Sequence, residues 1–313
     1  MTDACPPDVG APRTIGALVD ELAHALGAAA GAAGVEDARA EARDLVAALL
    51  DQARFWPSVH RDERVDAALV AQARAAAERR ARGAPFAYAV GRAAFRHLTL
   101  DVDERVLIPR QETEVLVDEV LAALGGRPGG VLVDVGTGSG AIALALACEA
   151  RAERVIATDV SLDALAVARR NAALLDAALC APVEFRHGSL LAPLGDLPPA
   201  SLRAVVSNPP YIAYAEADQL PPSVRDWEPA LALYAGNEGM AAIAALVRDA
   251  APLLAPGGLL ALEVDARRAG LAAELVASDG RYAEIAVRLD LAGRERFVLA
   301  VRAGGAAPAR RTA

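Results

Sequence analysis

The chain has 313 residues, of which 54% are hydrophobic, 23% charged and 4% aromatic, and its formal net charge is −9. This length allows about two domains of roughly 150 residues, and the composition is that of a globular protein. The acidic balance argues against a protein that binds nucleic acid mainly by neutralising phosphates. All 32 basic side chains are arginine, which excludes lysine Schiff-base chemistry and a P-loop lysine.

We expect neither a membrane segment nor a metal site. The longest apolar runs fall short of the ~18 residues that a spanning helix needs. Residues 1–10 carry acids and prolines instead of the pattern of a signal peptide. The three cysteines and four histidines lack the spacing of a zinc site or a disulfide framework. These features predict a cytoplasmic protein.

The N-terminal part of the chain has helical spacing of its apolar residues. A first helix is expected after Thr14, which is suited to be its N-cap, and the Gly- and Ala-rich segment 27–34 is expected to break it. Further helices are expected over 40–50 and 65–82. Because no strand pattern occurs in this part, we predict a small helical bundle.

A change to a period of two follows the bundle. Apolar and polar residues alternate from Leu98 to Val102, and Asp103-Glu104 is suited to a turn before Val106–Ile108. This pattern predicts a β-hairpin that joins two domains.

The remainder of the chain alternates strand and helix patterns. Strands are expected over residues 131–135, 154–158, 183–187, 202–207, 259–264, 284–289 and 296–301. Such alternation predicts an α/β fold whose mostly parallel sheet has helices on both faces. The last two strands are separated only by a short turn, so we expect them to form an antiparallel hairpin at the sheet edge. The domain boundaries that follow are a helical domain (1–92), a hairpin linker (93–110), an α/β domain (111–303) and a disordered tail (304–313).

A glycine-rich turn follows the first strand of the α/β region. The segment Gly136-Thr137-Gly138-Ser139-Gly140 leads from that strand into an apolar helix. Its glycines let the backbone turn sharply and let a ligand approach, and the helix N-terminus offers free amides. Asp159 ends the next strand, where a carboxylate can accept hydrogen bonds from ribose hydroxyls.

This turn is compatible with two cofactors. Gly136, Gly138 and Ala141 match the relaxed dinucleotide fingerprint. Asp134 lies within the turn, however, where a cationic sulfonium ligand is favoured over a pyrophosphate, and no hydride-transfer site follows. The turn therefore favours S-adenosylmethionine over a dinucleotide, and a purely structural glycine turn is a third alternative.

The fourth strand ends in Asn208-Pro209-Pro210-Tyr211, at the edge where open α/β sheets bind ligands. The nitrogen of a planar NH₂ group is a poor nucleophile because its lone pair is delocalised. The Asn208 side-chain oxygen and the Pro209 carbonyl can each accept one N–H, and the two prolines stiffen the loop that holds these acceptors. Tyr211 can pack against the planar group. This tetrapeptide indicates methyl transfer to such a nitrogen rather than an ordinary proline-rich turn.

Together these residues resemble the class I methyltransferases that carry the Asn-Pro-Pro-Tyr signature. Further stretches are similar to the branch of HemK/PrmC-type release factor glutamine methyltransferases. Those stretches are Arg79–Gly91 with Phe95, Val106–Glu114, Ser207–Ile212, Glu228–Pro229 with Ala232–Leu233, Gly236–Gly239 and Asp290–Arg296.

The resemblance implies a seven-stranded Rossmann-like methyltransferase domain with an N-terminal helical bundle and a linking hairpin. It implies methylation of the glutamine in the Gly-Gly-Gln motif of class 1 release factors, with S-adenosylmethionine as the cofactor. By position, the cofactor would be held by Gly136, Thr137, Gly138, Ser139, Gly140, Asp159, Leu190 and Asn208. The glutamine amide would be held by Asn208, Pro209, Pro210 and Tyr211. The bundle and hairpin would recognise the release factor, and we expect a monomer without direct nucleic-acid contact.

Some positions depart from the family pattern. Ser189 stands where an aspartate is usual, and Gln111 replaces a proline. Near Glu263, Asp265 and Arg267 stand where glycine and glutamine are common.

Three other functions share some of these features. An adenine-N6 methyltransferase also acts on a planar NH₂, but it needs a basic face or a large target-recognition domain. A glutamine methyltransferase of a ribosomal protein is not expected to contain Glu112-Thr113-Glu114. A cofactor-binding interaction protein would not need Asn208–Tyr211.

Overall fold

The computed structural model describes residues 14–33, 35–236 and 239–304. Residues 1–13, the predicted tail after residue 304, and the centre of the Gly236–Gly239 stretch lie outside these ranges. The chain divides into two compact units. One comprises residues 1–92 with 221–227, and the other comprises residues 93–220 with 228–313.

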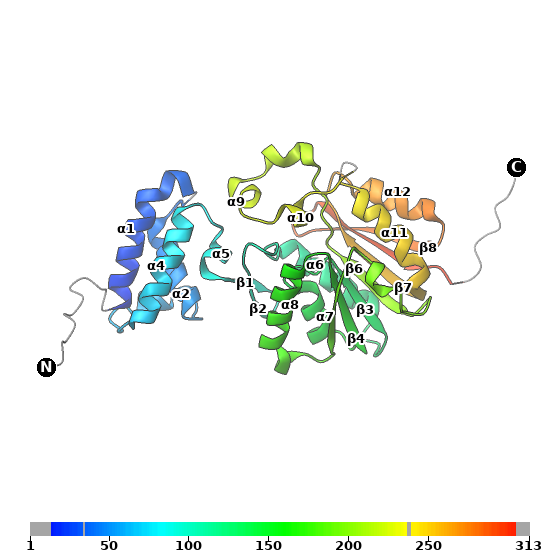
Figure 1. The fold of residues 1–313 in the computed structure, drawn as a ribbon, viewed down its shortest axis with the longest axis horizontal. Helices are drawn as coiled ribbons and strands as arrows, with labels where there is room; N and C mark the ends of the chain where they lie inside the picture. Colours follow the sequence, from blue (N-terminus) through cyan, green and yellow to red (C-terminus); the bar gives the residue numbers. More distant parts are fainter. Residues whose placement is uncertain (1–13, 34, 237–238, 305–313) are drawn as a thin grey trace, which may run out of the picture. The chain divides into compact units, whose positions relative to one another are not determined.

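The first unit is a helical bundle, whose helices within residues 14–92 are drawn in blue to cyan in Figure 1. Its helices are α1 (Ile15–Ala33), α2 (Ala38–Leu49), α3 (Trp56–Val59), α4 (Ala67–Ala81), α5 (Phe86–Val90) and the later short α9 (Pro222–Arg225). Leu18, Leu22 and Leu26 of α1 are buried at the four-residue spacing that places them on one face. The Thr14 hydroxyl accepts the N–H of Ala17 at 3.3 Å, as the predicted N-cap requires.

The predicted break after Leu26 is wrong, because α1 continues through Gly27 to Ala33. Alanine is the best helix former, and the two glycines of this segment, Gly27 and Gly31, each cost only about 1 kcal/mol relative to alanine in a helix. A side chain added at Gly27 would contact Ala38 at 3.8 Å, so the glycine lies where α1 approaches the start of α2. The buried Leu26 supplies the packing that carries the helix across this point.

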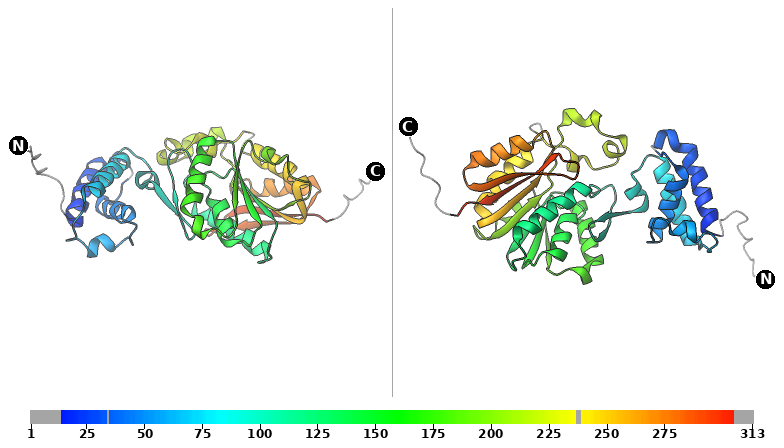
Figure 2. Two further views of the ribbon diagram at one scale, coloured as in Figure 1. Left: turned by 60° about the horizontal axis from the view of Figure 1, so that its bottom comes forward. Right: turned by 180° about the vertical axis from the view of Figure 1, so that it is seen from behind.

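The second unit contains the seven-stranded sheet, as predicted (Figure 2). Its strands are β3 (Val131–Val135), β4 (Arg154–Asp159), β5 (Val183–His187), β6 (Leu202–Ser207), β7 (Leu254–Glu263), β8 (Tyr282–Leu289) and β9 (Glu295–Arg302). They lie in the order β5-β4-β3-β6-β7-β9-β8. The first five are parallel, and the β8–β9 hairpin is antiparallel at the edge, which confirms the prediction.

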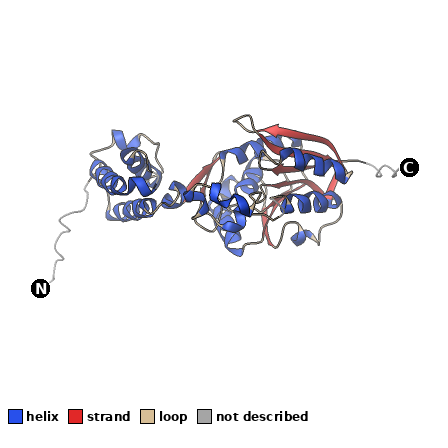
Figure 3. Cartoon of the chain, turned by 90° about the horizontal axis from the view of Figure 1, so that it is seen from above, coloured by secondary structure: helices blue, strands red, loops and turns tan. Residues whose placement is uncertain are grey.

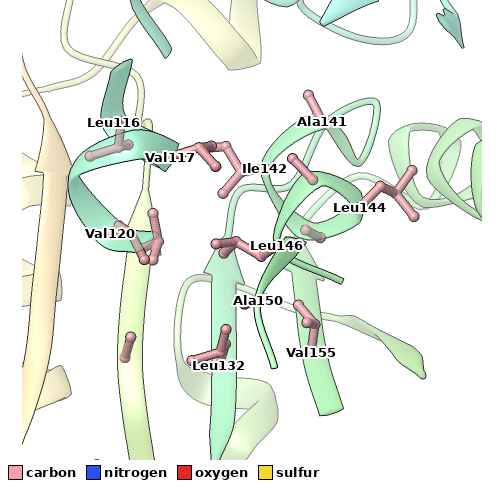
Figure 4. Packing of buried hydrophobic residues seen from close by; sticks show 14 of the residues in the cluster. Leu116, Val117, Val120, Leu132, Ala141, Ile142, Leu144, Leu146, Ala150 and Val155 are labelled. Atoms are coloured by element: carbon pink, nitrogen blue, oxygen red, sulfur yellow. The ribbon is translucent and has the colours of Figure 1, made fainter. Parts of the chain in front are cut away.

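Helices cover both faces of this sheet (Figure 3). They are α6 (Gln111–Leu124), α7 (Ala141–Glu149), α8 (Leu162–Leu174), α11 (Ala241–Leu253) and α12 (Ala269–Asp279). The unit also contains the short helix α10 (Ala230–Leu233) and 3₁₀ turns at Asp176–Ala178, Ala192–Leu194 and Tyr214–Gln219. Leu132 and Val155 face α6 and α7 (Figure 4), whereas Val133 and Ile156 face α11 and α12. This period of two produces two buried layers. Among the described residues, no helix has the length and apolarity needed to cross a membrane.

The hairpin lies earlier in the chain than predicted. Its strands are β1 (Arg92–Phe95) and β2 (Leu98–Asp101). They are joined by Arg96-His97, with Arg96 in the left-handed region at φ 55°. The predicted pairing of Val106–Ile108 as a strand is wrong, because the Ile108 N–H donates to the Glu228 carboxylate at 3.3 Å instead of to a strand.

Arg96 anchors this hairpin within the second unit. Its guanidinium donates to both carboxylate oxygens of Glu149 at 2.6 and 2.7 Å and to the Glu114 carbonyl at 2.9 Å. It also forms an ion pair with Asp118 at 2.8 Å, while its own side chain is only 11% exposed. One side chain in the hairpin turn therefore ties β1 and β2 to α6 and α7.

We expect Arg96→Ala to lower the free energy of unfolding by about 2 kcal/mol, because bidentate, partly buried charge pairs lose their partner. The matched control is Arg288→Ala, which removes one exposed contact to Glu119 at 3.3 Å and should change stability by less than about 0.5 kcal/mol. Urea denaturation followed by circular dichroism measures both. Equal effects of the two substitutions would contradict the anchoring role.

Candidate active site

Three neighbouring parallel strands end side by side at one edge of the sheet. Val135 of β3 is in register with Thr158 of β4 and with Ser207 of β6. The residues that follow them are Gly136, Asp159 and Asn208. The chain visits β4 before it returns to β6 on the other side of β3, so the strand order reverses here. Open α/β sheets bind their ligands at such a point.

A cleft of about 190 Å³ opens at this edge. Among the predicted site residues, those that line it are Gly136, Gly138, Asp159, Leu190, Asn208 and Pro210. Those outside its lining are Thr137, Ser139, Gly140, Pro209 and Tyr211. Sequence reasoning missed Val106 and Leu107, which follow the hairpin, and Leu231 and Ala232 of α10, all of which line the cleft. These apolar side chains carry no chemical signature in the sequence.

The glycines of the loop serve two purposes. A Cβ added to Gly136 or Gly138 would meet no atom within 4 Å, so both face open space where a ligand can approach the backbone. A Cβ added to Gly140 would lie 3.0 Å from Leu144 and 3.3 Å from Ala168. Gly140 is therefore required by the packing at the start of α7 rather than by the cleft.

Asp134 is turned inward, not toward the cleft. It is fully buried, and its Oδ2 accepts from the Thr137 hydroxyl at 2.6 Å and from the Ala143 N–H at 3.1 Å. Burial raises the pKa of its carboxyl to about 7, against the effect of these two hydrogen bonds. Asp134 is therefore not part of the cleft lining, and the preference for a cationic ligand near it remains a prediction. Its hydrogen bonds connect β3 to the loop and to the first turn of α7.

Asp159 is held in place by backbone donors. The Gly138 N–H donates to its Oδ2 at 2.9 Å, and the Ser161 N–H donates to its Oδ1 at 2.8 Å. Each carboxylate oxygen keeps a further lone pair, and the side chain lines the cleft. Asp159 can therefore still accept hydrogen bonds from a pair of neighbouring hydroxyl groups.

Ser189 and Leu190 form another part of the cleft wall. Leu190 has a φ of 49°, a conformation that is unusual for a leucine, and its carbonyl accepts from the Thr158 hydroxyl at 2.9 Å. This bond fixes the turn after β5, so that an apolar side chain and a small hydroxyl group face the cleft together.

Asn208 is connected to two buried residues from other parts of the sequence. Its Nδ2 donates to the Thr113 hydroxyl at 3.1 Å, and this hydroxyl donates to Glu263 Oε2 at 2.7 Å. Thr113 lies in the first turn of α6, and Glu263 is the last residue of β7. Sequence reasoning noted Glu263 but not this connection. A carboxylate at the end of an otherwise apolar strand is the signal that a buried donor must accompany it.

Asp265 and Arg267, two residues that differ from the family pattern, help to hold the loop after Tyr211 in place. Glu216 accepts from the Ala213 N–H at 3.1 Å, and it pairs with Arg267 and Arg268 at 3.0 Å. Asp265 in turn accepts from the Arg267 backbone and guanidinium at 2.9 and 2.8 Å. Asp265 and Arg267 thus hold the Tyr214–Gln219 turn against the segment that precedes α12.

An ion pair between the half-buried Arg110 and the buried Glu228 supports the segment before α6. Arg110 donates to Glu228 at 2.6 Å, and burial raises the pKa of Glu228 although Arg110 acts in the opposite direction. Helix α6 begins directly afterwards at Gln111. Proline is favoured at this first helical position but not required, so the departure from the family pattern leaves the helix start intact.

The chain matches two family models, the PrmC N-terminal domain over residues 21–91 and the Methyltransferase small domain over residues 110–220. Among curated proteins it is similar to a release factor glutamine methyltransferase of Moorella thermoacetica, with 42% identity over 90% of this chain and 98% of that relative. The release factor glutamine methyltransferase of Deinococcus radiodurans is also 42% identical, over 87% of this chain and 94% of the relative.

A solved structure shares the fold of about two thirds of this chain. A methyltransferase from Pyrococcus furiosus matches 67% of this chain and 92% of its own, with a TM-score of 0.50 and 18% identity. That likeness shows the fold alone, whereas identity across nearly the whole length of two relatives shows the family. The chain belongs to the family of release factor glutamine methyltransferases.

Proposed function

We propose that the protein transfers a methyl group from S-adenosylmethionine to the side-chain amide nitrogen of the glutamine in the Gly-Gly-Gln motif of class 1 release factors, in the cytoplasm. The observation that carries this proposal is the meeting of Gly136, Asp159 and Asn208 on one cleft. Gly136 and Asp159 offer backbone access and a hydrogen-bond acceptor to a nucleoside cofactor. Asn208 offers a hydrogen-bond acceptor to a carboxamide.

The residues of the cleft fit S-adenosylmethionine, which when bound supplies a methyl group on a positively charged sulfur. The open space beside Gly136 and Gly138 lets the cofactor approach the backbone. The unused lone pairs of Asp159 suit the ribose hydroxyls, and Leu190 offers an apolar surface for the adenine. The other predicted residues of the loop, Thr137, Ser139 and Gly140, do not line the cleft and would support the conformation of the loop.

The carboxamide would be held by uncharged acceptors. Asn208 Oδ1 and the Pro209 carbonyl each accept one N–H of the glutamine NH₂, which directs the lone pair of its nitrogen toward the methyl group. Pro209 and Pro210 stiffen this loop, so the acceptors need little reorganisation during the reaction. Tyr211 packs beside the planar amide, and burial raises its pKa to about 12, so its phenol remains neutral. The methylated nitrogen then loses one proton to water.

We also propose that the helical domain, residues 1–92, and the hairpin linker, 93–110, recognise the release factor and that residues 111–303 perform the transfer. The match of residues 21–91 to the PrmC N-terminal domain supports this division, because a domain particular to this family suits a substrate particular to it.

Mass spectrometry of a class 1 release factor, incubated with the enzyme and cofactor, tests the substrate. We expect the peptide with the Gly-Gly-Gln motif to gain the mass of one methyl group in place of a hydrogen, on the glutamine. A release factor with alanine at that glutamine is the control and should gain nothing. Methylation of a ribosomal protein or of adenine instead would contradict the proposal.

Asn208 and Asp159 should have separable effects. Asn208→Ala should lower kcat by about 100-fold or more, because a preorganised polar contact to the reacting group is lost, while the cofactor Kd stays within about threefold. Asp159→Ala should raise the cofactor Kd by about 10- to 100-fold, as expected when charge-assisted hydrogen bonds are removed. Calorimetry and single-turnover kinetics measure the two effects. The assignments fail if Asn208→Ala turns over normally or if Asp159→Ala binds cofactor as tightly as the parent.

A further inference from the structure

A buried hydrogen-bond relay, formed by Glu263, Thr113 and Asn208, lies behind the proposed acceptor site. Glu263 and Thr113 are 1% and 4% exposed, so water does not compete for their polar atoms. The relay distances are 2.7 Å from the Thr113 hydroxyl to Glu263 and 3.1 Å from Asn208 Nδ2 to that hydroxyl. The three residues come from β7, α6 and the loop after β6, so tertiary packing alone brings them together.

The chemistry of the hydroxyl gives this relay a direction. An ionised carboxylate can only accept hydrogen bonds, and a threonine hydroxyl has one proton to donate. When Thr113 gives that proton to Glu263, its oxygen can only accept from Asn208. The Asn208 amide must then turn its NH₂ toward Thr113, which leaves its oxygen for the cleft.

We propose that Thr113 and Glu263 are positioning residues that hold the Asn208 carboxamide with its oxygen toward the substrate. This inference rests on the proposed function, in which that oxygen accepts an N–H of the glutamine. An amide that flips would present its own NH₂ to the substrate NH₂, and two donors cannot bond to each other. The relay therefore selects the productive one of two orientations that have nearly the same shape.

The relay is sensitive to pH. Burial raises the pKa of Glu263 to about 7. The charges that act on it are those of Arg296 on β9 and of Glu112 and Arg110 at the start of α6, and Glu263 in turn acts on the neutral Tyr211 in the loop. A protonated Glu263 can donate to Thr113, whose own proton is then free to bond to Asn208. The Asn208 amide then no longer prefers the orientation with its oxygen toward the cleft. Methylation should therefore decrease as the pH falls through about 7.

Substitutions of Thr113 test the relay. Thr113→Val keeps the shape but removes the hydroxyl, and it should lower kcat by about 10- to 100-fold while leaving the cofactor Kd within about threefold. Thr113→Ser restores the hydroxyl and should recover activity to within about threefold of the parent. Ser278→Ala, which also removes one hydroxyl but at an exposed position of α12 outside the cleft lining, is the control and should behave as the parent. The cofactor Kd also shows that each variant is folded.

The dependence of kcat on pH distinguishes a positioning role of Glu263 from a role in packing alone. Glu263→Gln keeps the size and an acceptor oxygen but cannot ionise, so the decrease in kcat below about pH 7 should disappear. If Thr113→Val retains the parent kcat, or if Glu263→Gln retains the parent acid limb, the positioning role is refuted.

A spectroscopic measurement keeps this test independent of the substrate. The side-chain N–H signals of Asn208 in the ¹⁵N-labelled full-length protein, assigned by their absence in Asn208→Asp, should shift with a midpoint near pH 7. They should not shift in Glu263→Gln or in Thr113→Val. A titration without methylation of the release factor would support the relay and refute the proposed function. If the release factor is methylated but the Asn208 N–H signals of the parent do not shift with pH, the relay alone is refuted.

Discussion

The register between β3, β4 and β6 is the constraint on which the site depends. Parallel ladders align Val135 with Thr158 and Ser207, so the next residue of each strand emerges at the same edge. Adjacent strands lie about 4.8 Å apart, which brings groups distant in sequence within the span of one small ligand. A shift of one residue in any ladder would turn a side chain to the opposite face and would separate the proposed cofactor and amide sites.

Much of this fold can be predicted from local patterns. The sheet strands are short apolar runs separated by helical segments, and their alternation implies a mostly parallel sheet. Errors occurred where a tertiary contact overrides a local signal. Leu26 packs well enough to carry α1 across Gly27, although glycine and alanine together resemble a break. The hairpin turn at Arg96-His97 contains neither glycine nor asparagine, and it is stabilised by ion pairs to Glu149 and Asp118.

The site was predictable only where chemistry is concentrated in a short stretch. The glycine turn and Asn208–Tyr211 are contiguous, so their spacing carries information about function. The relay through Thr113 and the clamp on Glu216 each join residues more than fifty positions apart, and no local pattern reveals such pairs. Asp134 is a further example, because the sequence shows that it lies in the turn but not that its carboxylate is directed into the protein. The position of a residue in the sequence does not show in which direction its side chain points.

The central claim is that an uncharged, rigidly held pair of acceptors grips the carboxamide of the substrate glutamine. A crystal structure of the full-length enzyme with S-adenosylhomocysteine and a release factor tests it most directly. The account predicts that the glutamine nitrogen lies within hydrogen-bond distance, about 2.7–3.2 Å, of both Asn208 Oδ1 and the Pro209 carbonyl oxygen. A glutamine bound elsewhere, or one that meets the NH₂ group of Asn208 instead of its oxygen, would contradict it.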